Sequence, residues 1–127
     1  MADLLLFEAR GMGDRTLERL AASQLGVLGT ALFVADVVLL GPFAEETLFR
    51  GYLLPRLAAQ WGETPALVMS SLIFALFHPH YGPYMGLVFF YGWIFGWARL
   101  RSGGLSASVG LHMALNGFVT AVMFGRG

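Results

Sequence analysis

The sequence predicts an all-α integral membrane protein, a helical bundle of about five hydrophobic helices around a polar cavity within the bilayer. Composition is the first observation behind this prediction: 57% of the 127 residues are hydrophobic and 13% are charged, whereas a soluble domain carries about 25% charged residues. The mean hydropathy of +0.67 points the same way. The third observation is a series of apolar runs, some of them long enough to cross a bilayer.

The charge balance and the missing residue types exclude several classes of function. Eight Arg, no Lys and eight acidic residues give a formal net charge of zero. No basic stripe is present that could neutralise phosphates, so we expect no nucleic-acid partner. The chain has no cysteine, which excludes disulfides, Cys-ligated metals and a Cys nucleophile.

Residues 1–24 are expected to form a polar, amphipathic leader, separate from a transmembrane core at residues 25–127. Residues 8–24 hold three Arg and three acids, and Leu17 and Leu20 could share one helical face at the membrane interface. A solvated leader without a role is an equal alternative. The start of the chain lacks a positive segment before its apolar residues, so no cleavable signal peptide is predicted.

The first apolar run, residues 25–44, predicts a membrane-spanning helix. Its length corresponds to about 30 Å at about 1.5 Å per residue, the thickness of a hydrocarbon core. Asp36 is its only charge, and we expect this side chain to line a polar cavity or to bond to a neighbouring helix. Gly41 and Pro42 are expected to break the helix and to start another, because Pro is favourable at a first helical position.

A second helix is expected to run to about Trp61. Glu45 and Glu46 fall in its first turn, where acidic side chains suit the positive end of the helix dipole. This is the most polar helix of the predicted bundle.

Three further apolar runs complete the bundle, at residues 66–78, 84–98 and 105–124. The first of them is short for a full span. Gly92 and Gly96 lie four residues apart, a spacing of small residues that lets transmembrane helices approach closely.

Ionisable side chains at membrane depth are costly, so each one is a candidate functional residue. They are Asp36, Glu45, Glu46, Arg50, His78 and His112, with Asn116 as an uncharged companion. Glu46 and Arg50 lie at i and i+4 on one helix, with the acid before the base, and are expected to form a structural ion pair. This pairing leaves Glu45 without a local partner and makes it a candidate general base.

Two histidines and one asparagine complete the candidate constellation. Phe74 lies one helical turn before His78. His112 and Asn116 have the same spacing on the last helix. One such His alone could be an ordinary packed residue, but two on different helices, with a Glu pair on a third, supply a base, an acid and neutral donors. Those groups can activate water and stabilise a tetrahedral oxyanion. His80 is expected to be a loop residue.

Three motifs of this chain resemble those of the CPBP family, the CAAX proteases and bacteriocin-processing proteins that include type II CAAX prenyl endopeptidases. The motifs are EExxxR at Glu45-Glu46-Thr47-Leu48-Phe49-Arg50, FxxxH at Phe74-Ala75-Leu76-Phe77-His78 and HxxxN at His112-Met113-Ala114-Leu115-Asn116. They occur in the family's order on separate hydrophobic helices. The resemblance covers roughly residues 30–125.

The resemblance implies an intramembrane endopeptidase that hydrolyses a peptide bond of a membrane-associated peptide or protein. By motif position, Glu45 resembles the glutamate that activates water together with His78 in a polar catalytic cavity. His112 and Asn116 resemble the pair that stabilises the oxyanion.

The remaining motif residues resemble groups that support the site: Glu46, Arg50 and Phe74. The family has been described both as metal-dependent and as glutamate-type. A Glu and two His could hold Zn²⁺ with an open position, so a metalloendopeptidase with ligands Glu45, His78 and His112 stays open. We favour direct activation of water by Glu and His, because the chain has no HExxH helix.

Two alternatives stand beside an active endopeptidase. One is a non-catalytic membrane protein of the same fold, such as an immunity or scaffold protein. The other is a truncated, inactive family member, because the family usually has more helices before the first motif. The expected partners are a peptide or protein substrate and the lipid bilayer, and the oligomeric state is left open. The Arg-only basic set and the short loops favour a bacterial plasma membrane, with peptide maturation or self-immunity as the context.

Overall fold

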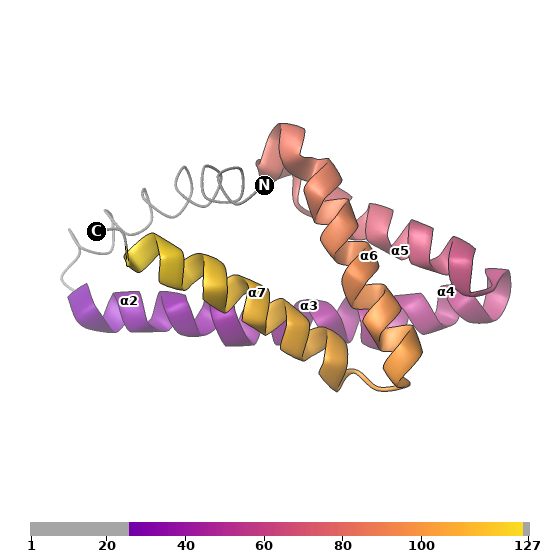
Figure 1. The fold of residues 1–127 in the computed structure, drawn as a ribbon, viewed down its shortest axis with the longest axis horizontal. Helices are drawn as coiled ribbons and strands as arrows, with labels where there is room; N and C mark the ends of the chain where they lie inside the picture. Colours follow the sequence, from indigo (N-terminus) through magenta and orange to yellow (C-terminus); the bar gives the residue numbers. More distant parts are fainter. Residues whose placement is uncertain (1–25, 126–127) are drawn as a thin grey trace. The chain divides into compact units, whose positions relative to one another are not determined.

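A computed structural model describes residues 26–125, and the regular secondary structure of these residues is helical throughout (Figure 1). Its elements are α2 (Gly26–Ala35), the π-helical segment η1 (Asp36–Leu40), α3 (Gly41–Glu46), the π-helical segment η2 (Thr47–Leu53), α4 (Leu54–Trp61), α5 (Glu63–Leu76), the 3₁₀ segment η3 (Pro79–Tyr84), α6 (Met85–Ser102) and α7 (Ser106–Phe124). The prediction of an all-α protein is confirmed. The expected leader at residues 1–24 lies outside the described residues.

The described residues divide into two compact units, and each is considered by itself. The first unit holds residues 26–42 and 113–125, and the second unit holds residues 43–112. In the first unit, α7 packs on η1 near Gly117, where a Cβ would lie 3.5 Å from Cγ1 of Val38.

The expected helix break at Gly41 and Pro42 is wrong. One helix of 36 residues runs without interruption from Gly26 to Trp61. Ahead of Pro42 the helix widens into a π turn, in which the Gly41 N–H donates to the carbonyl of Asp36. Such a turn accommodates a proline within a membrane helix, so the first two predicted segments are a single helix.

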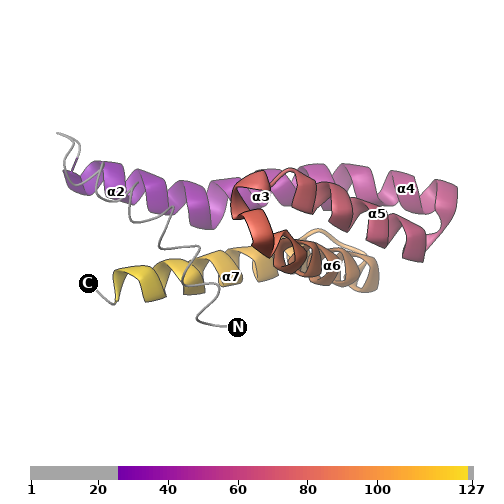
Figure 2. The ribbon, with the colours of Figure 1, turned by 90° about the horizontal axis from the view of Figure 1, so that it is seen from above.

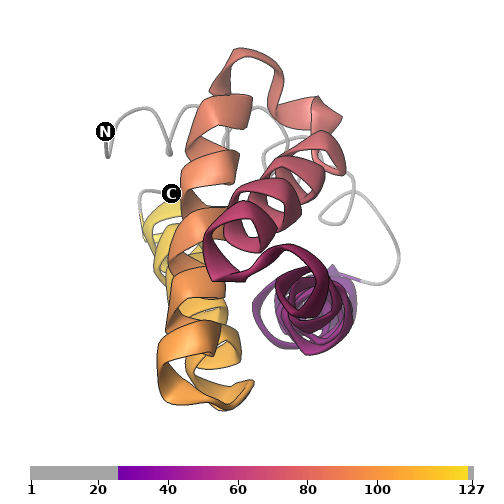
Figure 3. The same cartoon turned by 90° about the vertical axis from the view of Figure 1, so that its right-hand side faces the viewer.

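Three helices of the second unit surround its core. Gly62 adopts φ 84° between α4 and α5, a left-handed conformation that glycine accepts without cost. Figures 1 and 2 show α4 and α5 side by side, and Figure 3 shows α6 against α5 from another direction. A Cβ on Gly92 of α6 would lie 3.2 Å from Cα of Ser71 on α5. The close helix approach predicted at Gly92 is therefore confirmed.

The distribution of side chains is the inverse of that in a soluble protein. Glu46 and Arg50 are fully buried, whereas many large apolar side chains are exposed, among them Leu48, Leu72, Leu76, Phe77 and Phe90. An exposed apolar surface of this extent suits contact with lipid, and buried charges suit a polar interior. Within the described residues, Gly26–Trp61 and Ser106–Phe124 are long and apolar enough to cross a membrane, and α5 is shorter, as its sequence indicated.

Candidate active site

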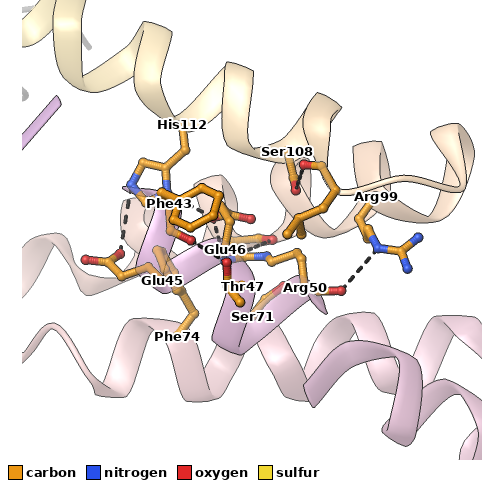
Figure 4. Close-up of polar contacts among 12 residues, drawn as sticks. Phe43, Glu45, Glu46, Thr47, Arg50, Ser71, Phe74, Arg99, Ser108 and His112 are labelled. Carbon is orange, nitrogen blue, oxygen red and sulfur yellow. Dashed lines mark hydrogen bonds and ion pairs between the residues drawn. The ribbon is translucent and has the colours of Figure 1, made fainter. Parts of the chain in front are cut away.

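The buried centre of the second unit is an ion pair between consecutive turns of one helix. Nη1 of Arg50 donates to Oε1 of Glu46 at 3.0 Å, and neither side chain is exposed (Figure 4). Nη2 of Arg50 donates to the carbonyl of Gly92 at 2.7 Å. The predicted i,i+4 pair is confirmed, and it also ties this helix to α6.

Aromatic rings enclose the Arg50 guanidinium. Its central carbon lies 4.4 Å from the ring centroid of Phe74, 5.5 Å from that of Phe95 and 5.8 Å from that of Phe49. Rings at these distances stabilise a cation through their quadrupoles, most strongly where water is excluded. The Phe74 ring also lies 4.6 Å from the ring of His78, so it supports both the ion pair and the neighbouring histidine.

His112 extends the ion pair into a three-residue cluster. Its Nδ1 lies 2.9 Å from Oε1 of Glu46, and its ring stacks on Phe95 at 4.6 Å. Because the carboxylate paired with Arg50 accepts hydrogen bonds, Nδ1 of His112 carries the hydrogen. Its other nitrogen, Nε2, is left for a further interaction.

His78 carries its ring hydrogen on the same nitrogen as His112. It follows the end of α5 with a non-helical backbone, and its Nδ1 lies 2.7 Å from the carbonyl of Phe74. A carbonyl oxygen can only accept, so Nδ1 carries the hydrogen and Nε2 is left with a lone pair in the neutral ring.

Glu45 lies next to these two free nitrogens. Its Oε2 is 3.6 Å from Nε2 of His78 and 3.9 Å from Nε2 of His112. Figure 4 shows the carboxylate and the His112 ring facing each other. Both distances exceed those of direct hydrogen bonds, about 2.7–3.2 Å. This oxygen is buried and has no hydrogen-bond partner among the described residues.

The structure therefore brings three of the four predicted catalytic residues together in the second unit. The fourth, Asn116, belongs to the first unit, where its Nδ2 donates to the carbonyl of Val37 at 2.9 Å. Asp36 is exposed in η1 of the same unit. His80 lies in η3, where its ring contacts those of His78 and Tyr81.

Two polar contacts of the site were not predicted. The carbonyl of Gly92 binds Arg50, and Nε of Arg99 donates to the carbonyl of Arg50 at 3.2 Å. The small residue at position 92 indicated a close helix approach, but no sequence pattern indicates which backbone oxygen becomes an acceptor. Arg99 directly follows the apolar run at residues 84–98, and nothing in the sequence there indicates its acceptor.

A metal centre finds no support in this arrangement. Within residues 26–125, no group of three or more His, Asp and Glu side chains is placed so that it could hold a metal ion. For the set considered for Zn²⁺ (Glu45, His78 and His112), the structure shows only that the carboxylate lies close to the two imidazoles.

Comparisons with known proteins found a family model and a relative that match this chain. A family model described as type II CAAX prenyl endopeptidase Rce1-like matches residues 27–118. An Escherichia coli protein described as an uncharacterized 24.3 kDa protein is 37% identical over 86 residues, which cover 65% of this chain and 40% of that protein. The chain thus spans 40% of the length of this relative. No solved structure matches the chain.

The family match covers more than half of the chain and includes the three motifs that carry Glu45, His78 and His112. The Rce1-like family is a membrane-embedded protease family, and the apolar helices and lipid-compatible surface agree with that setting. The chain belongs to the Rce1-like family of type II CAAX prenyl endopeptidases.

Proposed function

We propose that this chain carries the catalytic site of an intramembrane endopeptidase, in which Glu45 and His78 activate a water molecule. One observation supports this above all others. Oε2 of Glu45, a buried oxygen, lies 3.6 Å and 3.9 Å from two imidazole nitrogens whose ring partners, the Nδ1 atoms, are already engaged. This leaves a base and two oriented nitrogens at one place, which is the arrangement that water activation requires.

In the proposed reaction, Glu45 transfers one proton of the water molecule to the leaving amine. A water between Glu45 and His78 donates one hydrogen towards Oε2 of the carboxylate and the other towards Nε2 of the imidazole. As the water oxygen attacks the carbonyl carbon of the scissile bond, Glu45 takes the proton. When the tetrahedral intermediate collapses, the C–N bond breaks and that proton goes to the leaving amine. The products are a free carboxyl group and a free amine, and Glu45 is ionised again.

His112 is the candidate donor to the oxyanion. The contact of its Nδ1 with the Glu46 carboxylate, at 2.9 Å, fixes the ring so that Nε2 lies on the side of Glu45. The role of Asn116 in the same step rests on its position in the HxxxN motif. A fixed donor at the developing negative charge contributes about 2.7–4 kcal/mol to transition-state stabilisation.

The substrate we propose is a peptide or protein held in or at the membrane, because the carboxylate belongs to a helix apolar enough to span it. A bacterial plasma membrane and the maturation of a peptide are the proposed context. Direct action of Glu and His is proposed over a metal-dependent route, because the sequence has no HExxH helix.

The test is peptide cleavage by the purified chain in detergent, with wild type beside Glu45→Gln and a strong chelator in parallel arms. Removal of a general base lowers the rate by about 10²–10⁴-fold. We expect that loss in Glu45→Gln and no effect of the chelator on the wild type. Glu63→Gln is the matched control, because Glu63 is an exposed carboxylate at the start of α5.

Two other outcomes of the cleavage assay would indicate a different function. Loss of wild-type cleavage on chelation would establish a metal-dependent enzyme. A folded wild type that cleaves no member of a broad peptide library would contradict the proposal and favour a non-catalytic membrane protein of the same fold.

A further inference from the structure

Two prolines of the long helix follow π-helical turns in the same way. Before Pro42, the Gly41 N–H donates to the carbonyl of Asp36. Before Pro55, the Leu54 N–H donates to the carbonyl of Phe49. Each bond joins residues five positions apart, which is the hydrogen-bond pattern of a π-helix.

The next bond of that pattern cannot form in either place. In register, residue 42 would donate to the carbonyl of Val37, and residue 55 would donate to the carbonyl of Arg50. Proline has no N–H, so each π turn releases one carbonyl oxygen. In an apolar environment an unpaired backbone carbonyl is costly and requires a donor from elsewhere.

The helix cannot supply that donor locally. Ser and Thr hydroxyls can bond the carbonyl three or four residues earlier in a helix, as Thr47 does with Phe43. The corresponding positions after Val37 are residues 40 and 41, and those after Arg50 are residues 53 and 54. All four are Leu or Gly. A donor for either carbonyl must therefore come from another helix.

In both places another helix provides it. Nδ2 of Asn116, on α7, donates to the carbonyl of Val37 at 2.9 Å, and both residues belong to the first unit. Nε of Arg99, on α6, donates to the carbonyl of Arg50 at 3.2 Å, and both belong to the second unit (Figure 4). Each accepting oxygen is the one that the following proline leaves unpaired.

We propose that Asn116 and Arg99 are positioning residues that replace the missing N–H groups of Pro42 and Pro55. Each side chain holds a π turn in register within an otherwise continuous helix. This role is independent of the proposed peptidase activity. For Asn116 it uses one of two amide hydrogens, so the other stays available for the oxyanion role assigned to its motif.

Arg99 has the more direct consequence for the site. It fixes the backbone of Arg50, whose side chain binds Glu46 and the Gly92 carbonyl. Arg99 contacts none of the proposed reacting groups. Through Arg50 it holds in place the buried cluster that lies beside them.

The experiment is a pair of double-mutant cycles on the full chain in detergent, read as the midpoint of thermal unfolding. Asn116→Ala should lower the midpoint by about 4–8 °C, the shift expected when a bond worth about 1 kcal/mol is lost. In a Pro42→Ala background the backbone N–H is restored, and the same substitution should cost less than half of that shift. In a Pro55→Ala background it should cost the full amount.

The second double-mutant cycle tests Arg99 and Pro55 in the same way. Arg99→Met keeps the apolar stem and removes the donor, and its cost should be relieved by Pro55→Ala and not by Pro42→Ala. Arg101→Met, an exposed arginine on the same helix, is the matched control and should show no coupling to Pro55.

Additive midpoint shifts in a matched pair would overturn the proposal for that pair, and so would equal relief by either proline substitution. Pro42 is fully buried and its replacement could prevent folding. The cycle of Arg99 with the half-buried Pro55 decides the proposal in that event. Because unfolding is measured and not cleavage, failure of this inference is separate from failure of the proposed function.

Discussion

Glu45 and Glu46 are adjacent in the chain but lie in opposite environments. The Glu46 side chain is unexposed, bonded to Arg50 at 3.0 Å and to His112 at 2.9 Å. The Glu45 side chain is 36% exposed, and its Oε2 stays 3.6 Å from the nearest imidazole nitrogen. A helix turns by about 100° per residue, so neighbouring side chains point to different sides. The Glu46 carboxylate is bonded within the buried cluster, whereas Oε2 of Glu45 has no hydrogen-bond partner among the described residues.

The contrast supports the role proposed for Glu45, because the neighbouring carboxylate meets the structural need for a buried counter-ion. A buried ion pair is costly to desolvate and is weak evidence for stability by itself. Here the pair also anchors His112, and Arg50 donates to a backbone carbonyl of α6. The Glu46 cluster thus fixes the orientation of an imidazole that Glu45 faces, without using the Glu45 carboxylate for structure.

The largest change in stability is expected from Glu46→Gln. It leaves the Arg50 charge buried without its counter-ion, and breaking a buried pair in this way costs about 3–5 kcal/mol of the free energy of unfolding. The measurement is unfolding in mixed micelles with increasing SDS. Glu63→Gln, an exposed carboxylate, should change the free energy by less than about 0.5 kcal/mol. Equal stability of the two variants would show that the buried pair is not structural.

Gly92→Ala is expected to have the next largest effect. Its Cβ would lie 3.2 Å from Cα of Ser71 and 3.3 Å from Nη2 of Arg50, so α6 must move from α5 and displace the carbonyl that binds Arg50. Overpacking of this kind costs about 1–3 kcal/mol. Gly86→Ala on the same helix meets nothing within 4 Å and should be neutral or stabilising by about 0.5–1 kcal/mol. The same SDS titration compares them, and a neutral Gly92→Ala would contradict the close packing.

The two histidines should differ in how much each contributes to stability, as the two glutamates do. His112→Leu leaves Glu46 one hydrogen bond short in a buried site and should cost about 1–3 kcal/mol, besides lowering cleavage. His78→Leu removes a donor from a part-buried hydrogen bond to the Phe74 carbonyl and should cost about 0.5–1.5 kcal/mol while lowering cleavage as strongly. Unfolding and peptide cleavage measured on both variants test this. A larger loss of stability for His78 than for His112 would reverse the assignment.

Sequence patterns were sufficient for much of this arrangement. Apolar runs predicted the helices now seen as α5, α6 and α7 to within a few residues, and the i,i+4 spacing predicted the pair of Glu46 with Arg50. These features depend on neighbours within one helical turn or on the length of an apolar run, and both can be recognised in a single sequence.

What could not be predicted depends on contacts between distant segments. Proline at position 42 indicated a helix break, because its missing N–H is visible in the sequence. The compensating donor, Asn116, is 79 positions from the carbonyl it binds, and nothing local indicates it. The same holds for the contact of His112 with Glu46, 66 positions away. Spacing made both histidines candidates, but only the structure shows which carboxylate each one faces.

The most direct test of the central claim is to measure stability and cleavage together on Glu45→Gln. Because Glu45 is half exposed and makes no direct hydrogen bond to a described residue through Oε2, its free energy of unfolding should stay within about 0.5 kcal/mol of the wild type. Cleavage of a peptide substrate should fall at least about 100-fold. Wild-type cleavage by a folded Glu45→Gln protein, or a loss of stability as large as that of Glu46→Gln, would contradict the division of roles between the two carboxylates.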